Sequence, residues 1–530
     1  MQLTNEQKYI LDLVKQGEPL IKILAFAGSG KTTILKEIAN ANKDKRLLYL
    51  AFNKAIQTEA KKKFPSNTEV RTTHSLAYKY IVSSHRYQVR NSDYKLIELK
   101  DILSEKNWNV LKIVKIMLKE FFNTDYDDIE AVYKKRRSYV VGKIESDDLE
   151  KEAIDLTIKL YTMMKSGDIE VTHDFYLKEF QLKLKRKEIK MKPYDIILLD
   201  EAQDLNRVVY NIFKYLPAKQ KVVVGDNHQS IYSFRGAVNA LNKFKKGKVA
   251  YLTTSFRVTQ PIANYANHIL SQLKLETKPL VSGNKTKDYQ IKTIAYISRT
   301  NSNLILYFDR LLSKGVNQSD IKFVRHPYEI FGLLLNLQKF KMGLDLDDSF
   351  KYLLNYDAQD MKELQQNAKK ADDKELLSAI KVLRILAGVN LFELYKKAMT
   401  CYNKNKNREV THTLLTAHTS KGLEFDKVIL LDGFTLSNNI MSYIENNDDD
   451  IINLDLSELF LFYNVDELID MIYYVVKNNI SPALIEEFNL FYVAVTRARY
   501  EIELNDDELE LFFNSKNLKE FLETLKKENS

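Results

Sequence analysis

Short apolar runs alternate with amphipathic stretches over residues 20–82. The runs ILAFA (23–27) and LLYLAF (47–52), with a short piece near Val70, are typical of buried strands. Between them, residues 32–40 and 55–64 carry apolar side chains at helical spacing. Strands that alternate with helices in this way predict a parallel sheet covered by helices.

Residues 83–190 follow a different pattern. They are rich in lysine, and apolar residues recur at helical spacing, as in 110–122. Strand-like runs then return as YDIILLD (194–200), KVVVGD (221–226) and VAYLTT (249–254). The pattern predicts an α/β domain that is interrupted by a helical insertion.

The second half of the chain repeats this arrangement less clearly. Residues 291–298, 414–417 and 427–432 are strand-like, and 303–408 are mostly helical. An acidic stretch, 446–455, lies in a long connection before Leu490. Residues 507–530 are highly charged, and we expect them to form a helix and tail that is a solvated surface element.

Composition limits the possible classes of protein. The chain has 530 residues, of which 45% are hydrophobic and 28% charged, with only 15 Gly and 8 Pro, as expected of a globular, helix-rich protein of several domains. The net charge of +9 permits a polyanionic partner without requiring one. The single cysteine, Cys401, excludes a disulfide framework and a cysteine-rich metal site.

The sequence also bears on location. The first 20 residues include several charged side chains, so they do not resemble a signal peptide. The apolar runs are shorter than the roughly 20 residues that a membrane helix needs. We therefore expect a cytoplasmic protein without a membrane partner, nucleoid-associated if bacterial. A nuclear or viral origin is equally compatible.

The segment AFAGSGKT (25–32) follows an apolar strand and opens a helix, which is the context of a phosphate-binding loop. Its glycines allow backbone N–H groups to face phosphate oxygens. Lys31 would reach the β- and γ-phosphates of ATP, and Thr32 would bind Mg²⁺. Ala25 stands where the strict pattern has Gly. The residues expected to contact ATP here are Ala27, Gly28, Ser29, Gly30, Lys31, Thr32 and Thr33.

A pair of acidic residues, Asp200 and Glu201, follows the buried run IILL (196–199). A carboxylate at the carboxyl end of a parallel strand lies beside the phosphate loop. Asp200 can then hold Mg²⁺, and Glu201 can take a proton from an attacking water. A surface turn after a strand is the alternative interpretation of this pair by itself.

Further motifs occur in a regular order. They are TNEQ (4–7), AFAGSGKT (25–32), AFNK (51–54), RTTHSLA (71–77), DEAQD (200–204), GDNHQSIYSFRGA (225–237), SFR (255–257), TAHTSKGLEFD (416–426) and FYVAVTRAR (491–499). In this order the chain resembles the UvrD/Rep-type superfamily 1 helicases, and among them the F-box DNA helicase group, without an F-box region.

The resemblance implies two RecA-like P-loop NTPase motor domains of the α/β class. The first would comprise residues 1–84 and 191–256, with a helical insertion at 85–190. The second would comprise residues 257–302 and 409–506, with a small helical insertion at 303–408 and a charged tail at 507–530. A compact regulatory or duplex-contacting role is expected for the second insertion.

The resemblance also implies roles at the ATP site. Gln7 would read the adenine edge, and Gln229 would sense the γ-phosphate. Arg257 and Arg497 would act as arginine fingers, and Glu424 would hold the ribose or adjoining groups. Each of the two arginines, taken alone, is also compatible with a surface salt bridge.

The family places base-stacking aromatics at Phe52, Tyr232 and Phe234, the last at a position where relatives often have Trp. The remaining residues expected to contact DNA are Asn53, Lys54, Arg71, Thr73, His74 and His418. The basic runs 134–137 and 183–187 lie in the first insertion, where they could bind duplex DNA or form a solvated face.

The resulting hypothesis is an ATP-dependent DNA helicase that moves 3′ to 5′ along single-stranded DNA, with polarity taken from the resemblance alone. Its expected partners are single-stranded DNA and ss/ds DNA junctions, with a recombinase or single-strand-binding protein as a further candidate, and it is expected to be monomeric. Alternatives are a translocase that strips recombinase from DNA, a scaffold with an inactive ATPase, and a motor that acts on RNA.

Overall fold

The computed structural model describes residues 3–141, 147–232, 236–370, 373–434, 436–445, 460 and 463–528. Phe234 and the acidic stretch 446–455 therefore lie outside the described residues. Contacts divide the chain into two compact units, one of Met1–Ala25 and Gly30–Leu252 and the other of Phe26–Ser29 and Thr253–Ser530.

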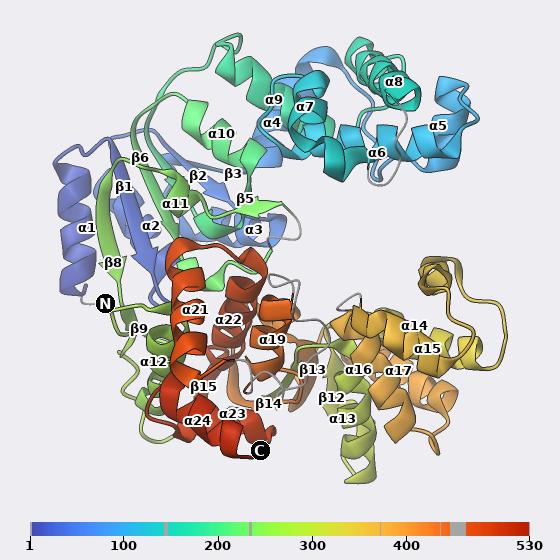
Figure 1. Cartoon of the computed structure of the whole chain (residues 1–530). Coiled ribbons are helices and arrows are strands. Elements are labelled where there is room, and N and C mark those ends of the chain that lie inside the picture. The colour runs from blue at the N-terminus through green and yellow to red at the C-terminus, as the bar shows by residue number, and fades with distance from the viewer. Residues whose placement is uncertain are drawn as a thin grey trace. The chain divides into compact units, whose positions relative to one another are not determined.

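The first unit is built on a six-stranded parallel sheet with the order β3-β2-β4-β6-β1-β8 (Figure 1). Its strands are β1 (Leu20–Ala25), β2 (Leu47–Ala51), β3 (Thr68–Thr72), β4 (Tyr194–Leu199), β6 (Ala218–Gly225) and β8 (Lys248–Leu252). All five residues of β2 are buried, as expected of a parallel strand covered on both faces.

Helices cover both faces of this sheet. The core on one face joins the strands to α1 (Asn5–Lys15), α2 (Lys31–Ala41) and α3 (Lys54–Lys63). On the other face lie α4 (Thr73–His85), α10 (Arg207–Tyr215) and the short α11 (Ala240–Lys243). Short elements follow β4 and β6 at their carboxyl ends: η1 (Ala202–Asp204), β5 (Leu205–Asn206), η2 (Asn227–Gln229) and β7 (Ala237–Val238).

Five helices between β3 and β4 form the first insertion. They are α5 (Leu96–Leu103), α6 (Trp108–Asn123), α7 (Ile129–Val141), α8 (Asp147–Ser166) and α9 (His173–Lys185). A single hydrophobic cluster runs from Leu50 in β2 through Leu76 in α4 to Phe180 in α9 and Met117 in α6. The insertion therefore shares a core with the sheet, because α9 packs against both α4 and α10.

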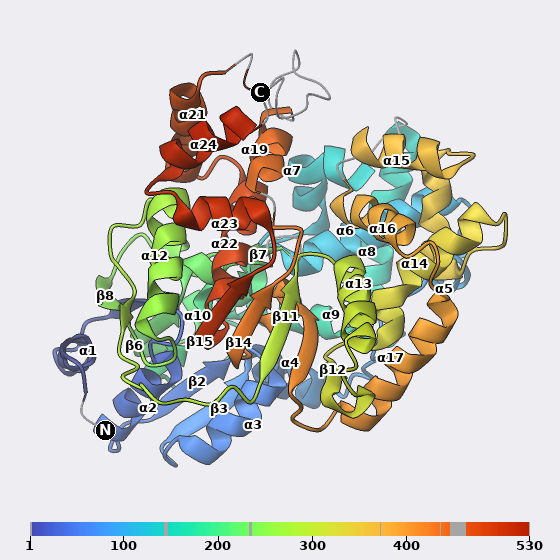
Figure 2. The same ribbon diagram turned by 90° about the horizontal axis from the view of Figure 1, so that it is seen from below.

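The second unit contains a five-stranded parallel sheet with the order β12-β13-β11-β14-β15 (Figure 2). Its strands are β11 (Ile294–Ser298), β12 (Ile321–Phe323), β13 (His412–Thr416), β14 (Phe425–Leu430) and β15 (Ala498–Leu504). A two-stranded ribbon, β9 (Thr254–Ser255) with β10 (Val281–Ser282), precedes it.

Two groups of helices accompany the second sheet. Those on the sheet itself are α12 (Gln260–Lys274), α13 (Asn301–Ser313), α18 (Ala417–Ser420) and α22 (Pro482–Val495), while α19 (Leu436–Glu445) packs on α22 and α21 (Val465–Asn478) packs on α12. Those between β12 and β13 are α14 (Pro327–Lys341), η5 (Asp348–Tyr356), α15 (Met361–Lys370), α16 (Lys374–Ile385) and α17 (Leu391–Asn405), with η4 (Gln318–Asp320) just before β12.

The hydrophobic pattern of the sequence does not predict two strands of this sheet. β12 has only three residues, so its apolar alternation is too short to detect. β15 has the sequence ARYEIEL, and its polar side chains obscure the strand pattern. Both are edge strands, where exposed polar residues are common.

The C-terminal segment differs from its expected form. It comprises α23 (Asp507–Asn514) and α24 (Leu518–Glu528), and the prediction of a solvated surface element is wrong for their apolar faces. Phe512 is buried with ring centroids 6.1 Å from Phe491 and 5.5 Å from Phe521, and α24 packs against α21. The charges lie on the opposite side of amphipathic helices, which a count of charged residues does not reveal.

In the part of the chain that the structure describes, no helix is both long enough and apolar enough to cross a bilayer.

The buried C-terminal helix makes a stability prediction. Phe521→Ala should lower the free energy of unfolding by about 3–4 kcal/mol, because it removes a fully buried ring and leaves a cavity. Urea unfolding followed by circular dichroism measures this change. Glu523→Ala, on the exposed face of the same helix, should change it by less than about 0.5 kcal/mol. Equal effects from the two substitutions would contradict the packing.

Candidate nucleotide site and the residues around it

The loop between β1 and α2 is shaped by two glycines. Gly28 and Gly30 have φ angles of 69° and 84°, in the left-handed region that favours glycine. Gly30 is also the residue that caps the N-terminus of α2, and it has no side chain to occupy the first N–H groups of the helix. Those donors and the positive end of the helix make an anion-binding position.

The tip of the loop, Phe26–Ser29, makes its contacts within the second unit. The Ala27 N–H donates to the Tyr492 hydroxyl at 3.2 Å, and the Gly28 carbonyl accepts from the Phe256 N–H at 2.9 Å. A Cβ added to Gly28 would lie 2.6 Å from Arg257 Cβ. Glycine is therefore required here for close approach as well as for its φ angle.

Lys31 lies among carboxylates at the start of α2. Its Nζ is 3.1 Å from Glu201 Oε2. Burial acts to lower the pKa of Lys31, but the negative charges of Glu201, Asp226 and Asp200 outweigh it and raise the pKa above its ordinary value. The lysine is therefore held in its charged form.

Asp200 is almost fully buried, with 2% of its surface exposed. Its Oδ2 accepts from the Thr32 hydroxyl at 3.3 Å and from the Tyr49 hydroxyl at 2.9 Å, and its Oδ1 accepts from the Glu201 N–H at 2.9 Å. Burial, followed by the adjacent charge of Glu201, raises the pKa of Asp200 to about 6.

Glu201 has a φ of 51°, an unfavourable left-handed conformation for a residue with a Cβ. Its Oε2 also accepts from Gln203 Nε2 at 2.6 Å. The side-chain oxygen Oε1 of Gln203 in turn accepts from the Asp226 N–H at 3.0 Å. Strain of this kind persists where surrounding bonds hold a residue, and here they direct the carboxylate toward Lys31.

The strand β6 brings Gln229 to the same place. Gln229 is buried, and its Nε2 donates to Asp226 Oδ2 at 2.7 Å. A Cβ on Gly225 would lie 2.4 Å from Gln203 Oε1, so only glycine leaves room for the Gln203 link.

Gln7 lies at the other side of the loop. Its Oε1 accepts from the Thr4 N–H at 3.1 Å and so caps the first turn of α1. Its Nε2 would be 3.7 Å from a Cβ added to Gly30, so the amide nitrogen is directed toward the phosphate loop. Thr33 lies in the first turn of α2 beside Gly30.

The donor atoms suit Mg²⁺. Thr32 Oγ1 and Asp200 Oδ2 are hard oxygen ligands only 3.3 Å apart. Three carboxylates, Asp200, Glu201 and Asp226, surround the single cation Lys31. The excess of negative charge over Lys31 favours a divalent cation at this position.

Four of the residues expected to contact DNA line one cavity of about 290 Å³ in the first unit. They are Phe52, Thr73, His74 and Tyr232, and Asp200 lies in the wall of the same cavity. Phe52 is 42% exposed although it follows a fully buried strand. The cavity thus links the exposed aromatic side chain to the acidic residue beside Thr32.

The other expected DNA contacts are not part of that cavity wall. Asn53 Oδ1 accepts from the Ile56 N–H at 2.9 Å and caps α3, and Lys54 is exposed at the start of that helix. Arg71 Nε donates to Glu69 at 3.1 Å. His418 is half-buried in α18 of the second unit.

A network of charged side chains lies in the second unit. Glu424 accepts from Arg257 Nε at 2.7 Å through one oxygen and from Arg499 Nη2 through the other. Burial acts to raise the pKa of Glu424, but the bonds and charges of the two arginines outweigh it and lower the pKa. Glu424, expected to hold ribose, is therefore engaged with both arginines in this structure.

Arg497 is buried, with 1% of its surface exposed. Its guanidinium donates to the carbonyls of Val493 at 2.8 Å and Leu423 at 3.1 Å. Arg497 thus joins α22 to the segment before β14, one residue from Glu424.

Comparison with known proteins decides the family. Residues 3–249 match the family described as the UvrD/REP helicase N-terminal domain. The first unit therefore belongs to the UvrD/Rep-type superfamily 1 helicases. The two parallel sheets of the chain are accordingly the two RecA-like domains of that class, as the sequence predicts.

Curated relatives of this UvrD/Rep-type chain come from several organisms. It is 28% identical to F-box DNA helicase 1 of Gallus gallus over 82% of this chain and 45% of that protein. It is 28% identical to F-box DNA helicase protein 1 of Schizosaccharomyces pombe over 96% of this chain and 58% of that protein. A probable DNA helicase II homolog of Mycoplasma genitalium is 24% identical, over 93% of this chain and 83% of that protein. The chain thus spans about half the length of the two F-box relatives.

Three residues of the UvrD/Rep-type site escaped the sequence analysis. Tyr49 lies in β2 and reaches Asp200 only because β2 and β4 are neighbours in the sheet. Gln203 lies inside DEAQD and Arg499 inside TRAR, and these motifs do not indicate which side chains the two residues contact. A polar hydroxyl in the middle of LLYLAF was the available signal for Tyr49.

The pH dependence of stability follows from the raised pKa of Asp200. Between the ordinary value of 3.8 and about 6, the folded state keeps a proton that the unfolded state releases, so stability falls as pH rises through this window. Asp200→Asn removes this loss. Its Tm relative to the parent should rise between pH 4 and 6.5 and be higher by a few degrees at pH 7.5. A difference that is the same at every pH would contradict the assignment.

Proposed function

We propose that this chain is an ATP-dependent DNA helicase that translocates 3′ to 5′ along single-stranded DNA and unwinds duplexes in replication, repair or recombination. The observation that carries the proposal is the convergence of Lys31, Thr32, Asp200 and Glu201 within hydrogen-bond distance at the carboxyl end of β4. These are the groups that phosphoryl transfer requires: a cation, an oxygen pair for Mg²⁺ and a base.

The contacts of Lys31 suggest how the site responds to ATP. Lys31 and Glu201 form an ion pair and neutralise each other in this structure. Phosphate oxygens carry more charge than one carboxylate, so Lys31 transfers from Glu201 to the β- and γ-phosphates. Glu201 is then available to accept a proton from water, with Gln203 orienting its carboxylate. Bound Mg²⁺ neutralises charge on the phosphates, and Thr32 and Asp200 would hold it.

The remaining roles are assigned as the sequence implies. Gln7 contacts adenine, and Gln229 contacts the γ-phosphate. Arg257 and Arg497 stabilise the charge that develops on the transferred phosphoryl group. Glu424 differs from its expected role at the ribose: we propose that it positions Arg257, because its carboxylate holds the Arg257 Nε at 2.7 Å.

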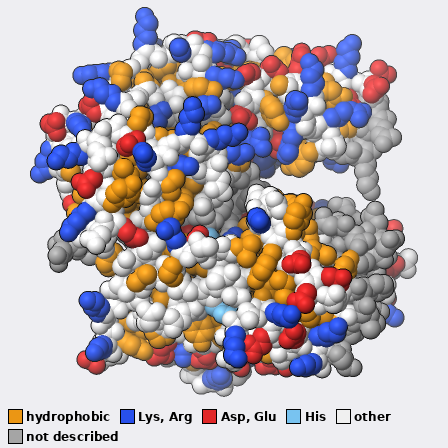
Figure 3. All heavy atoms as spheres, turned by 60° about the vertical axis from the view of Figure 1, so that its left-hand side comes forward, with side chains coloured by type: hydrophobic (Ala, Val, Ile, Leu, Met, Phe, Trp, Pro, Cys, Tyr) orange, Lys and Arg blue, Asp and Glu red, His pale blue; other side chains and the backbone are white. Residues whose placement is uncertain are grey.

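Coupling between ATP and DNA is supported by the cavity in the first unit. Tyr49 bonds Asp200 from the middle of β2, and Phe52 follows the end of the same strand. A shift of Asp200 is therefore transmitted along β2 to an exposed ring suited to stacking on a base. Lys and Arg side chains are numerous on the face of the first unit seen at the top of Figure 3, which suits a polyanionic strand.

A direct test compares ATP hydrolysis with and without single-stranded DNA in the parent, Lys31→Ala and Lys36→Ala. Lys36 lies in the same helix and serves as the matched control. We expect strong stimulation by DNA in the parent and in Lys36→Ala, and no hydrolysis in Lys31→Ala. DNA binding without hydrolysis by the parent would indicate a scaffold instead.

The same proteins are then tested on duplexes with a 3′ or a 5′ single-stranded tail and on DNA coated with recombinase. Unwinding of the 3′-tailed duplex alone is expected. Hydrolysis with protein displacement but without strand separation would indicate the translocase, and equal activity on both tails would contradict the polarity.

Substitutions in the charged network around Glu424 test whether this residue positions Arg257 or contacts the nucleotide. Arg499→Gln should lower kcat for ATP hydrolysis about fivefold with KM unchanged, because a partly exposed ion pair contributes up to about 1 kcal/mol to holding Glu424 against Arg257. Arg499→Lys should recover part of the loss. The control Lys427→Gln removes a neighbouring pair with Glu503 and should leave kcat unchanged. A change in KM instead would indicate that Glu424 contacts the nucleotide.

A further inference from the structure

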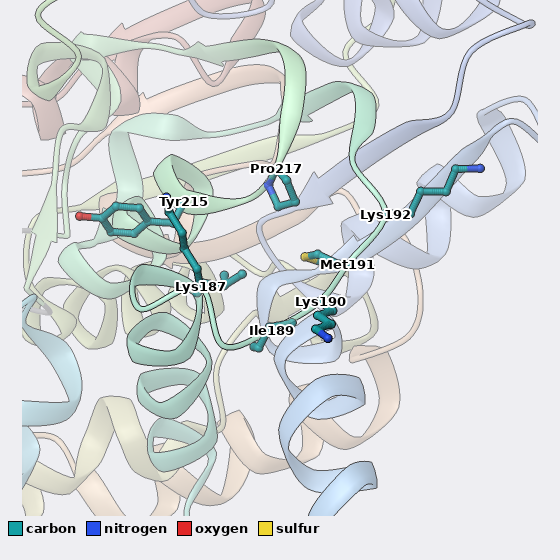
Figure 4. Close-up of a pocket in the computed structure, with 8 residues that line it drawn as sticks. Lys187, Ile189, Lys190, Met191, Lys192, Tyr215 and Pro217 are labelled. Carbon is teal, nitrogen blue, oxygen red and sulfur yellow. The ribbon is translucent and has the colours of Figure 1, made fainter.

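A pocket of about 570 Å³ lies in the first unit where the chain leaves α9 and enters β4 (Figure 4). None of its lining residues belongs to the nucleotide site or to the cavity beside Phe52. Its apolar lining comes from three places: Leu184 at the end of α9, Ile189 and Met191 in the connection, and Tyr215 at the end of α10 with Pro217 just before β6. The volume lies within the ordinary range for ligand pockets.

The sequence of the connection explains this lining. Residues 189–192 read Ile-Lys-Met-Lys, and an extended chain directs alternate side chains to opposite sides. Ile189 and Met191 are half-buried, whereas Lys190 and Lys192 are exposed. Figure 4 shows Lys192 extending away from the other side chains of the group.

The connection begins at a left-handed residue that is not glycine. Helix α9 ends with the Glu188 N–H bonded to the Lys183 carbonyl at 2.9 Å, which places Lys187 at φ 59°. Glycine is the usual residue there, and a lysine costs roughly 1 kcal/mol of local strain. Lys187 therefore places a positive charge at the pocket edge in a locally strained conformation.

The lysines of the pocket are not neutralised by described neighbours. Lys187, Lys190 and Lys192 form no ion pair with any residue that the structure describes, whereas nearby Lys185 pairs with Asp127 and Lys219 with Asp195. Glu188 is the one acidic residue of the sequence between 186 and 193. The pocket therefore combines an apolar interior with a positively charged edge.

We propose that this pocket binds an acidic segment of a partner protein that carries one large apolar side chain. The apolar side chain fills the space beside Met191 and Pro217, and carboxylates pair with Lys187 and Lys190. A nucleic-acid duplex presents sugars and phosphates at its outer surface, whereas a peptide presents carboxylates together with an apolar side chain, so charge complementarity and lining together favour a peptide. This partner site is additional to the helicase activity proposed above and does not depend on it.

Fluorescence anisotropy with short labelled peptides tests the proposal on the full chain. The probe is a peptide of Asp and Ser with one central Phe. Its Phe→Ala and all-Asn versions should each bind about tenfold more weakly, since each lacks one of the two features that the pocket recognises. Equal binding of the Phe and Ala peptides would overturn the proposal.

Variants place the binding at the pocket. Lys190→Glu should weaken binding of the Phe peptide about fivefold, and Met191→Ser should do the same. Lys187→Gly removes the charge at a position that glycine favours, so it should weaken binding without lowering Tm. The control Lys43→Glu, at an exposed position outside both basic runs, should bind like the parent.

A single-stranded oligonucleotide tests whether nucleic acid, instead of a peptide, binds in the pocket. It should not displace the Phe peptide, and its own binding should be unaffected by Met191→Ser. Displacement of the peptide, together with weaker oligonucleotide binding by Lys190→Glu, would identify a nucleic-acid surface and refute the peptide site. ATP hydrolysis of the same variants should equal that of the parent, and this readout is independent of the helicase proposal.

Discussion

The structure of the first unit depends on one buried charge balance. Lys31 lies at the start of α2, where three carboxylates from two neighbouring strands converge on it. Burial, followed by the adjacent charge of Glu201, raises the pKa of Asp200, and Glu201 itself has a strained backbone conformation. A divalent cation would supply the positive charge that the ionised form of Asp200 needs.

The second unit satisfies its charges in a related way. Glu424 is shared by Arg257 and Arg499. Asp426 extends the network, and it also accepts from the backbone N–H groups of Lys292 and Thr293. Arg497 is held by carbonyl groups. Guanidinium groups with protein partners of this kind are kept in a defined orientation, which is the property that a phosphate-binding arginine needs.

The insertion has more than one consequence for the first unit. Because α9 packs on α4 and α10, the hydrophobic core is continuous from the sheet into the insertion, and the return to β4 must cross the sheet edge. That return creates the lysine-edged pocket. The same packing carries His74 and Tyr176 into edge contact, so the residues near the exposed Phe52 are supported by the insertion itself.

The sequence by itself determined the alternation of strands and helices, the phosphate loop, the acidic pair and the order of the motifs, because these depend on neighbours within a few residues. Periodicity failed where a strand was short, as for β12, or where apolar positions formed one face of charged helices, as for α23 and α24. Tertiary structure alone decided that Tyr49 reaches Asp200 and that Glu424 lies between two arginines. Such contacts depend on which strands are neighbours in a sheet. Burial and charge then act between residues that are far apart in the sequence, so they leave no local pattern in the chain.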